Sequence, residues 1–257
     1  MGCTAIILAG GRGSRMNSDI PKQYMDLNGK PILFYSLKAF EENCNIEDII
    51  LVTGDGEEAY CGKEIVEKYG FLKVNDIVPG GSERYLSVYQ GLLAMQSHLE
   101  KEESLETKKA ADTTKDRLVY IHDGARPCIS STLIDQLYED TLQYGASIAA
   151  VPVKDTIKIV DAEGFVTETP DRSALWQIQT PQVFSYPLIM HAYEQLMQNP
   201  CEGITDDAMV LEKMTGHRIH ITPGSYENIK ITTAEDIAIA QIFLNLQGDK
   251  SANQKEI

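Results

Sequence analysis

The sequence predicts an α/β fold in which helices cover both faces of a mostly parallel central sheet. Two observations support this prediction. Short continuous apolar runs, such as residues 5–8 and 49–53, are typical of strands that are buried on both faces. Segments with helical spacing follow these runs, as at residues 31–42 and 60–69. Because strand and helix alternate at regular intervals, we expect the strands to run parallel and to be joined by helical crossovers.

The remaining elements continue this alternation along the chain. Ser82 and Thr233 are expected to cap the helices that follow them, and Pro31 suits a first helical turn. The segment 97–117 is rich in Glu, Lys and Thr, which predicts a solvated helix end and a flexible loop without an assigned function. Further strands are predicted at 77–78, 118–122, 148–153, 219–221 and 228–231, and further helices at 82–92, 133–142, 187–196, 205–214 and 234–246.

A β-hairpin interrupts the alternation of strand and helix. Residues 156–160 alternate polar and apolar side chains, residues 161–164 form a turn, and the chain returns through 165–168. A two-stranded ribbon is marginally stable alone in water, so this protruding arm is expected to pack against another surface. A second subunit is the natural candidate, and the hairpin therefore predicts a homodimer.

The domain organisation is expected to be simple. The chain of 257 residues contains neither an internal repeat nor a linker of the kind that separates domains. We expect a single domain over residues 1–247, with the arm inserted at about 153–174. Residues 248–257 are polar and are expected to form a disordered tail.

Composition and charge argue against several classes of protein. The formal net charge of −15 disfavours nonspecific binding to nucleic acid or to an anionic membrane surface. No apolar run approaches the roughly 18–20 residues that span a bilayer, and no signal peptide is recognised before the first strand. The five cysteines have neither metal-ligand nor redox spacing, so reduced thiols and a cytoplasmic location are expected.

The loop after the first apolar run carries Gly10, Gly11 and Gly13. Glycine lets the backbone approach a ligand and permits positive φ, so that successive N–H groups can form an anion-binding nest. Arg15 and Lys22 place two cations within reach of this loop in an otherwise acidic chain. The combination favours a polyphosphate whose negative charge rises during a reaction. The loop is neither a P-loop nor a complete dinucleotide fingerprint, and an ordinary structural turn is the alternative.

Two later turns are expected to face the same crevice, because the carboxyl ends of parallel strands share one edge of a sheet. Residues 80–81 are both glycine and precede the helix near Ser82, although an ordinary capped turn would look the same. Asp123 follows the strand at 118–122, where a carboxylate can hold a divalent cation or a ribose. The alternative for Asp123 is a turn cap that pairs with Arg126.

Other titratable groups are expected to be structural. His122 has no base partner and no neighbour with metal-ligand spacing. Asp206 and Asp207 could bind a metal, but helix N-termini favour Asp, so capping is the expected role. Gly-x-Ser-x-Gly, His-Glu-x-x-His and an evident Cys/His pair are all absent from the sequence. Any chemistry is therefore expected to depend on electrostatics rather than on a covalent intermediate.

Eight motifs, in this order, resemble those of the 2-C-methyl-D-erythritol 4-phosphate cytidylyltransferase family of the non-mevalonate isoprenoid pathway. The resemblance extends from residue 3 to about residue 246. The motifs are Leu8-Ala9-Gly10-Gly11 with Ser14-Arg15-Met16, Pro21-Lys22-Gln23, His122-Asp123-Gly124-Ala125-Arg126-Pro127, Pro152-Val153-Lys154-Asp155-Thr156, Asp171-Arg172, Gln179-Thr180-Pro181-Gln182, Thr205-Asp206-Asp207-Ala208 and Asn228-Ile229-Lys230.

The resemblance implies a Rossmann-like nucleotidyltransferase fold, a homodimer joined through the arm, and Mg²⁺ as cofactor. It implies transfer of a cytidylyl group from CTP to a polyol phosphate, 2-C-methyl-D-erythritol 4-phosphate, with release of pyrophosphate. Arg15 and Lys22 would stabilise charge at the α-phosphate during in-line attack, and Asp123 would hold the metal and the ribose. The implied nucleotide site comprises Ala9, Gly10, Gly11, Gly13, Gly81, Ser82, Ser87 and Asp123. The implied sugar-phosphate site comprises Arg126, Thr180 and Lys230, with Thr156 and Arg172 from the partner's arm.

Related activities stay open. The first loop is one residue longer than the shortest family version, in a form also seen in ribitol-5-phosphate cytidylyltransferases. Ser82 stands where some family members carry Asp. A sugar-1-phosphate nucleotidyltransferase shares the first loop, and a non-catalytic nucleotide-binding module would keep the glycines. The residues at 153–158 and the His-Asp-Gly-Ala-Arg-Pro motif favour methylerythritol phosphate as the acceptor.

Overall fold

A seven-stranded sheet forms the centre of the molecule in the computed structural model, which describes residues 2–11, 20–105 and 117–253. The strands lie in the order β11-β7-β10-β6-β1-β4-β5. All adjacent pairs are parallel except those of β10, which runs antiparallel to both β6 and β7. The mostly parallel sheet is therefore confirmed. The strand bounds are β1 Cys3–Ala9, β4 Asp48–Thr53, β5 Val74–Pro79, β6 Leu118–Asp123, β7 Ala146–Pro152, β10 Trp176–Ser185 and β11 His220–Pro223.

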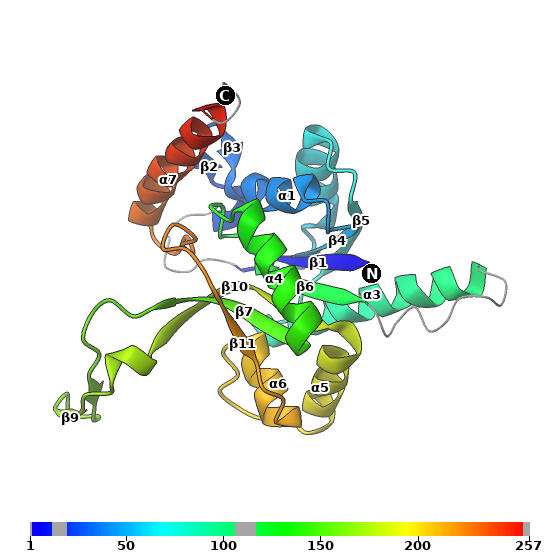
Figure 1. Cartoon of the computed structure of the whole chain (residues 1–257). Coiled ribbons are helices and arrows are strands. Elements are labelled where there is room, and N and C mark those ends of the chain that lie inside the picture. The colour runs from blue at the N-terminus through cyan, green and yellow to red at the C-terminus, as the bar shows by residue number, and fades with distance from the viewer. Residues whose placement is uncertain (1, 12–19, 106–116, 254–257) are drawn as a thin grey trace.

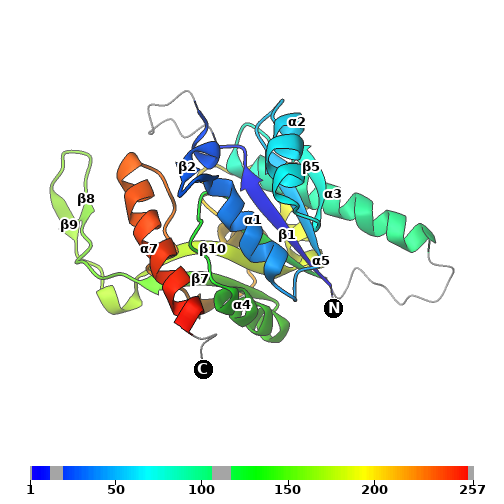
Figure 2. The same cartoon turned by 90° about the horizontal axis from the view of Figure 1, so that it is seen from above.

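Helices cover both faces of this sheet, as predicted (Figure 2). One face carries α1 (Ile32–Glu42), the π-helical segment η3 (Cys61–Glu67) that continues α2 (Glu58–Tyr60), and α4 (Ser131–Tyr144). The other face carries α3 (Arg84–Leu105), α5 (Tyr186–Gln198) and α6 (Asp207–Thr215). Strand β1 shows why the apolar runs are continuous. Ile7 packs into the core of the first face and Ile6 into that of the second, so both sides of the strand are buried.

A third apolar cluster attaches the C-terminal helix α7 (Ala234–Asn253) to the outside of α1. Its members include Ile32 of α1 and Ala240 of α7, next to the short hairpin of β2 (Asp26–Leu27) and β3 (Lys30–Pro31). Thr233 immediately precedes α7, and its N–H donates to Asp236 Oδ2 at 2.9 Å, as expected for a cap. Helix α7 continues to Asn253, past the start of the polar tail predicted from residue 248, because a single glycine at 248 weakens but does not end a helix.

The hairpin arm projects from the body of the molecule (Figure 1). Its strands are β8 (Ile159–Val160) and β9 (Val166–Glu168), and the 3₁₀ helix η4 (Arg172–Ala174) follows before the chain enters β10. Large apolar side chains on the arm are exposed, with 67% of Phe165 and 58% of Val166 accessible. The protruding hairpin is confirmed, and its apolar surface lacks a covering element within the part of the chain that the structure describes.

One predicted element is wrong, and one observed strand has no counterpart among the predictions. Residues 228–231 form no strand, because their backbone bonds to turns instead: Ile231 N–H donates to the carbonyl of Ala125 at 2.9 Å. No strand is predicted from the sequence at residues 176–185, where β10 pairs with both β6 and β7. Helix α3 begins at Arg84 and continues to Leu105, and the rest of the segment expected to be flexible, 106–116, lies outside the described residues. Among the described helices, none has the length and apolar character needed to cross a bilayer.

Candidate active site

A cavity of about 830 Å³ opens over the carboxyl ends of β1, β4, β5 and β6. The sheet order reverses at β1, since β4 and β5 lie on one side of it and β6 lies on the other. Ligands of open α/β sheets bind in the crevice at such a reversal, beyond the carboxyl ends of the strands. The volume is within the range of small-molecule sites and suits a nucleotide. The expectation that several turns share one crevice is confirmed, because Gly10, Gly81 and Asp123 all line it.

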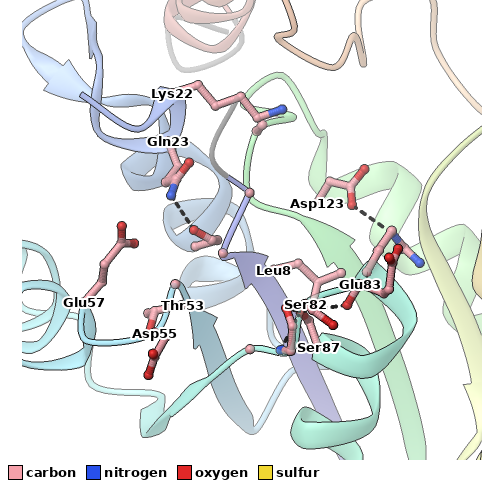
Figure 3. A pocket seen from close by; sticks show the side chains of 18 of the residues that line it. Leu8, Lys22, Gln23, Thr53, Asp55, Glu57, Ser82, Glu83, Ser87 and Asp123 are labelled. Atoms are coloured by element: carbon pink, nitrogen blue, oxygen red, sulfur yellow. Dashed lines mark hydrogen bonds and ion pairs between the residues drawn. The ribbon is translucent and has the colours of Figure 1, made fainter. Parts of the chain in front are cut away.

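Lys22 lies at one side of the cavity, opposite Ser82 and Ser87 (Figure 3). It belongs to the 3₁₀ helix η2 (Lys22–Tyr24), and its Nζ donates to the carbonyl of Ile231 at 3.2 Å. The rest of η2 is anchored on both sides. Gln23 Nε2 donates to the carbonyl of Ala9 at 2.5 Å, and Tyr24 Oη donates to Glu57 at 2.8 Å. The lysine is therefore held above the cavity by bonds to the end of β1 and to the segment 229–231.

Of the two glycines in the first loop at the cavity, only Gly10 lies so close to another backbone segment that a side chain would clash. A Cβ on Gly10 would lie 2.9 Å from the carbonyl oxygen of Thr53, at the end of β4, whereas a Cβ on Gly11 would meet nothing within 4 Å among the described residues. Neither residue has φ in the left-handed region, so the expected use of positive φ is not found at these two positions. In the second turn, Gly81 N–H donates to Ser87 Oγ at 3.1 Å, and both residues line the cavity with Ser82.

Asp123 is surrounded by three cations at the end of β6. Its Oδ2 lies 2.8 Å from Lys230 Nζ and 3.8 Å from Arg126 Nε, and its Oδ1 lies 3.4 Å from Arg84 Nε. Burial opposes ionisation of this carboxyl, yet Arg84, Lys230 and Arg126 hold its pKa well below the usual range. The pairing with Arg126 that was considered as an alternative does occur, but Asp123 also lines the cavity.

A buried hydrogen-bond network fixes the backbone at Asp123. Thr180 Oγ1 accepts from Asp123 N–H at 3.0 Å and lies 3.1 Å from Nδ1 of His122. Nε2 of His122 lies 3.3 Å from the carbonyl of Arg126, so the ring is satisfied when it donates from Nε2 and accepts at Nδ1. Burial lowers the pKa of His122 to about 3. The structural role expected for His122 agrees with this arrangement. Thr180 contacts the backbone of Asp123.

Arg84 is a site residue that sequence reasoning missed. It lines the cavity and forms a bidentate ion pair with Asp207, with Nη1–Oδ1 and Nη2–Oδ2 both at 2.8 Å. Asp206 caps α6 as expected, because its Oδ1 accepts from Met209 N–H at 2.9 Å. The same role is wrong for Asp207, since its fully buried carboxylate is directed at Arg84 instead. The pair is 123 positions apart, and only the fold brings it together.

The other predicted site residues fall into three groups: those at the cavity, those on the arm, and those outside the described residues. Ala9, Gly11 and Lys230 line the cavity. Thr156 and Arg172 are exposed on the arm, where Arg172 Nη1 donates to the carbonyl of Lys154 at 2.9 Å. Gly13 and Arg15 lie outside the described residues.

The donor set at the cavity suits a metal that arrives with a nucleotide. No group of three or more His, Cys, Asp or Glu side chains with the geometry of a metal site occurs among the described residues. Mg²⁺, however, is commonly bound through one or two carboxylates together with substrate phosphates and water. Asp123 supplies one ionised carboxylate at the wall of a cavity large enough for those phosphates. The residues present therefore fit Mg²⁺ as part of a metal–nucleotide complex.

Fold and site together define a class. A mostly parallel sheet with a glycine-lined cavity at its reversal point is typical of nucleotide-binding proteins. The cations beside the cavity are arranged to stabilise phosphate charge, as in enzymes that transfer phosphoryl or nucleotidyl groups. The molecule is thus an α/β protein of the nucleotidyltransferase class.

Comparison with known proteins identifies the family within this class. Residues 3–246 match the family model of 2-C-methyl-D-erythritol 4-phosphate cytidylyltransferase. Curated members of that name from Lachnospira eligens and Lachnoclostridium phytofermentans are 50% and 44% identical, over 94% and 96% of this chain and 98% and 97% of their own lengths. The chain belongs to the 2-C-methyl-D-erythritol 4-phosphate cytidylyltransferase family.

Solved structures agree with this assignment. A 4-diphosphocytidyl-2C-methyl-D-erythritol synthase from Anaerococcus prevotii superposes with a TM-score of 0.74 at 33% identity, over 95% of this chain and 96% of that one. A 2-C-methyl-D-erythritol 4-phosphate cytidylyltransferase from Francisella tularensis superposes with a TM-score of 0.73 at 31% identity, over 95% of this chain and all of that one. The nucleotidyltransferase fold expected from the sequence is therefore confirmed.

Proposed function

We propose that this enzyme transfers the cytidylyl group of CTP to 2-C-methyl-D-erythritol 4-phosphate. The products are 4-diphosphocytidyl-2-C-methyl-D-erythritol and pyrophosphate. The observation that carries this proposal is the cavity at the sheet reversal, where Lys22, Asp123 and Lys230 converge in a chain of net charge −15. The family to which the chain belongs supports the choice of substrates.

The reaction proceeds by in-line attack at the α-phosphate of CTP. A phosphate oxygen of the acceptor forms the new bond to the α-phosphorus, and the bond from that phosphorus to the bridging oxygen of the β-phosphate breaks. No protein nucleophile takes part in this scheme. Lys22, together with Arg15, offsets the charge that grows on the α-phosphate oxygens. Positioning and charge stabilisation of this kind supply most of the catalysis in phosphoryl transfer.

The two substrates occupy opposite parts of the site. The nucleotide lies along the glycine turns, against Ala9, Gly10, Gly11 and Gly13 in the first and Gly81, Ser82 and Ser87 in the second. The acceptor phosphate lies at Arg126, Thr180 and Lys230. The adjacency of Arg126 and Lys230 to one carboxylate oxygen of Asp123 supports this placement, because both cations face the same point.

Asp123 would hold Mg²⁺ in the metal–nucleotide complex. The bound ion would offset phosphate charge and help to align the triphosphate. Lys230 and Arg126 supply counter-charge for this buried carboxylate.

The enzyme is proposed to work as a homodimer in the cytoplasm. Residues 1–247 form its nucleotidyltransferase domain, and the arm at about 153–174 reaches the partner, to which it contributes Thr156 and Arg172. The exposed apolar side chains of the arm support dimerisation, since such surface is commonly buried in an interface. The unpaired state of all five cysteines supports a reducing compartment.

A pyrophosphate-release assay with CTP and three separate acceptors tests this function. We expect turnover with 2-C-methyl-D-erythritol 4-phosphate to exceed that with ribitol 5-phosphate or a sugar 1-phosphate by at least a hundredfold in kcat/KM. Equal or faster turnover with ribitol 5-phosphate would assign the enzyme to that alternative. Binding of CTP without turnover of any acceptor would favour the non-catalytic alternative.

A further inference from the structure

Arg84 joins the cavity to the interior of the molecule on the α3 side of the sheet. It is the first residue of α3, and 28% of its side chain is exposed. Its Nη1 and Nη2 are both taken up by Asp207, while its Nε is directed at Asp123 Oδ1 at 3.4 Å. One guanidinium group therefore connects a fully buried carboxylate with the carboxylate at the cavity wall.

Asp207 is held rigidly, so it can fix the orientation of the guanidinium plane. Its Oδ1 accepts from the buried hydroxyl of Tyr193 at 2.6 Å in addition to Arg84. Its backbone N–H donates to Gln182 Oε1 at 3.1 Å, and that amide oxygen also accepts from Ala208 N–H at 2.9 Å. A buried carboxylate with this many donors has little freedom to rotate, and a bidentate pair adds directional control.

The two oxygens of Asp123 consequently have different partners. Oδ1 faces Arg84, whose position is set by Asp207, whereas Oδ2 faces Lys230 at 2.8 Å and Arg126 at 3.8 Å. Pinning of Oδ1 fixes the carboxylate plane and directs Oδ2 toward the side of the cavity where Lys230 lies. Lysine at position 84 would retain the charge but lose the planar fork that makes this geometry possible.

We propose that Arg84 is a positioning residue, clamped by Asp207 and Tyr193, that orients the Asp123 carboxylate for the metal–nucleotide complex. This inference rests on the function proposed above. It gives α5 and α6 a role in nucleotide binding. The role is exerted through the side chains of Tyr193, Asp207 and Arg84, which lead to Asp123. A purely structural ion pair between α3 and α6 would have no such dependence on Asp123.

A double-mutant cycle between Arg84→Lys and Asp123→Asn tests the proposal. The measured quantity is the dissociation constant of α,β-methylene CTP with Mg²⁺, determined by isothermal titration calorimetry on the full-length chain. We expect Arg84→Lys to weaken binding about tenfold when Asp123 is present and less than twofold when Asn replaces it. An equal loss in both backgrounds would show that Arg84 acts independently of Asp123, and would overturn the proposal.

Tyr193→Phe provides a second test that keeps every charge and almost all of the side-chain volume. It removes only the hydroxyl that donates to Asp207, and we expect three- to fivefold weaker binding of the same analogue. Tyr89→Phe is a matched control, because the Tyr89 ring stacks on that of Tyr193 with centroids 6.3 Å apart. We expect Tyr89→Phe to change binding less than 1.5-fold. Equal effects of the two substitutions, or no effect of Tyr193→Phe, would contradict the clamp even if Arg84→Lys failed to fold.

Failure of this inference is distinguishable from failure of the proposed function. Wild-type chain that releases pyrophosphate from CTP and 2-C-methyl-D-erythritol 4-phosphate supports the function whatever the result of the cycle. Wild-type chain that binds the analogue but lacks that activity leaves the calorimetric cycle as a direct test of whether Arg84 acts through Asp123.

Discussion

The charge on Asp123 decides the electrostatics of the cavity. A buried carboxylate with no partner would become neutral at ordinary pH, because desolvation disfavours its charged form. Here Arg84, Lys230 and Arg126 together reverse that preference and keep its pKa low. Because Asp207 neutralises part of this charge, three cations face two carboxylates here, which leaves one positive charge in excess in a strongly acidic chain. That excess favours a phosphate group beside Asp123 in spite of the net charge.

His122 is expected to make the folded state less stable as the pH falls. Its pKa is about 3 in the folded protein because of burial, against about 6.5 in an unfolded chain. The unfolded state therefore binds the proton first, and stability is lost from about pH 6.5 down to about pH 3. Between pH 7 and 5 this single group is expected to lower the free energy of unfolding by about 2 kcal/mol. Urea unfolding at the two pH values measures the change.

The comparison with His122→Gln isolates this contribution from those of the other histidines. The variant loses stability at both pH values, but its stability is expected to fall about 2 kcal/mol less than that of the wild type between pH 7 and 5. Asp123 does not confound the measurement, since its pKa is lowered by folding and its contribution is lost only below about pH 4. An identical pH dependence in variant and wild type would mean that folding leaves the pKa of His122 unchanged, and would contradict the account.

Sequence reasoning at the residue scale succeeded where a residue stands at the end of an apolar run. Asp123 directly follows the buried part of a strand, and the sheet geometry then places it at the cavity edge. Arg84 was missed because its role depends on Asp207, which lies 123 positions away in the sequence and reaches it only in the folded chain. Asp207 was misassigned for the same reason: its position at a helix N-terminus suggested a cap, and nothing local distinguishes it from Asp206.

At the scale of elements, a testable prediction follows from how closely the first loop approaches the end of β4. Gly10→Ala would place a Cβ 2.9 Å from the carbonyl oxygen of Thr53, a contact that only a backbone shift can relieve. We expect a loss of about 1–3 kcal/mol in the free energy of unfolding, together with weaker binding of CTP. Urea unfolding and calorimetry with α,β-methylene CTP measure the two effects.

Gly11→Ala is the matched control for this substitution. In the part of the chain that the structure describes, the added methyl group meets nothing within 4 Å, and the backbone is outside the left-handed region. We expect less than about 0.5 kcal/mol of change in stability, as for ordinary surface positions. A larger loss for Gly11→Ala than for Gly10→Ala would contradict the account of why the loop carries glycine at position 10.

Elements with a strong hydrophobic pattern were predicted well, whereas a strand with irregular pairing was not. The apolar runs of β1, β4 and β6 mark strands buried on both faces, so pattern alone identifies them. β10 begins with exposed residues and changes register between Ile178 and Gln182, which removes a clean pattern. At residues 228–231 the alternating apolar side chains pack against α7 without any strand partner. Alternation of polar and apolar residues indicates that one side of a segment is buried. It identifies a strand only when a neighbouring strand supplies the backbone hydrogen bonds.

At the scale of the whole molecule, the arm predicts a dimer that two added charges can break. Phe165 is 67% exposed on the arm, and burial of such a side chain in an interface contributes about 2 kcal/mol. We expect Phe165→Glu together with Val166→Glu to convert the dimer into monomers, as measured by size-exclusion chromatography with light scattering. Leu72→Glu is the control, because Leu72 is 85% exposed and lies outside the arm. A wild-type monomer, or a dimer that survives both charges, would contradict the proposed interface.

A site shared between subunits also predicts complementation. Arg172→Ala removes the proposed contribution of the arm to the partner's acceptor site, whereas Lys22→Ala removes the positive charge proposed to stabilise the α-phosphate within one chain. When the two inactive variants exchange subunits, about a quarter of the sites are expected to regain both residues. Recovery of pyrophosphate release on mixing measures this, and no recovery after verified subunit exchange would count against a shared site.

The central claim is that the cavity at the sheet reversal catalyses cytidylyl transfer by stabilising charge, and Lys22→Ala tests it most directly. We expect kcat with CTP and 2-C-methyl-D-erythritol 4-phosphate to fall by about 10²–10³, the usual effect of removing one group that stabilises transition-state charge. The dissociation constant of α,β-methylene CTP is expected to change less than threefold. Lys38→Ala, which removes an exposed lysine paired with Glu42 on α1, is expected to leave both quantities unchanged. Full cytidylyl transfer by Lys22→Ala would contradict the claim.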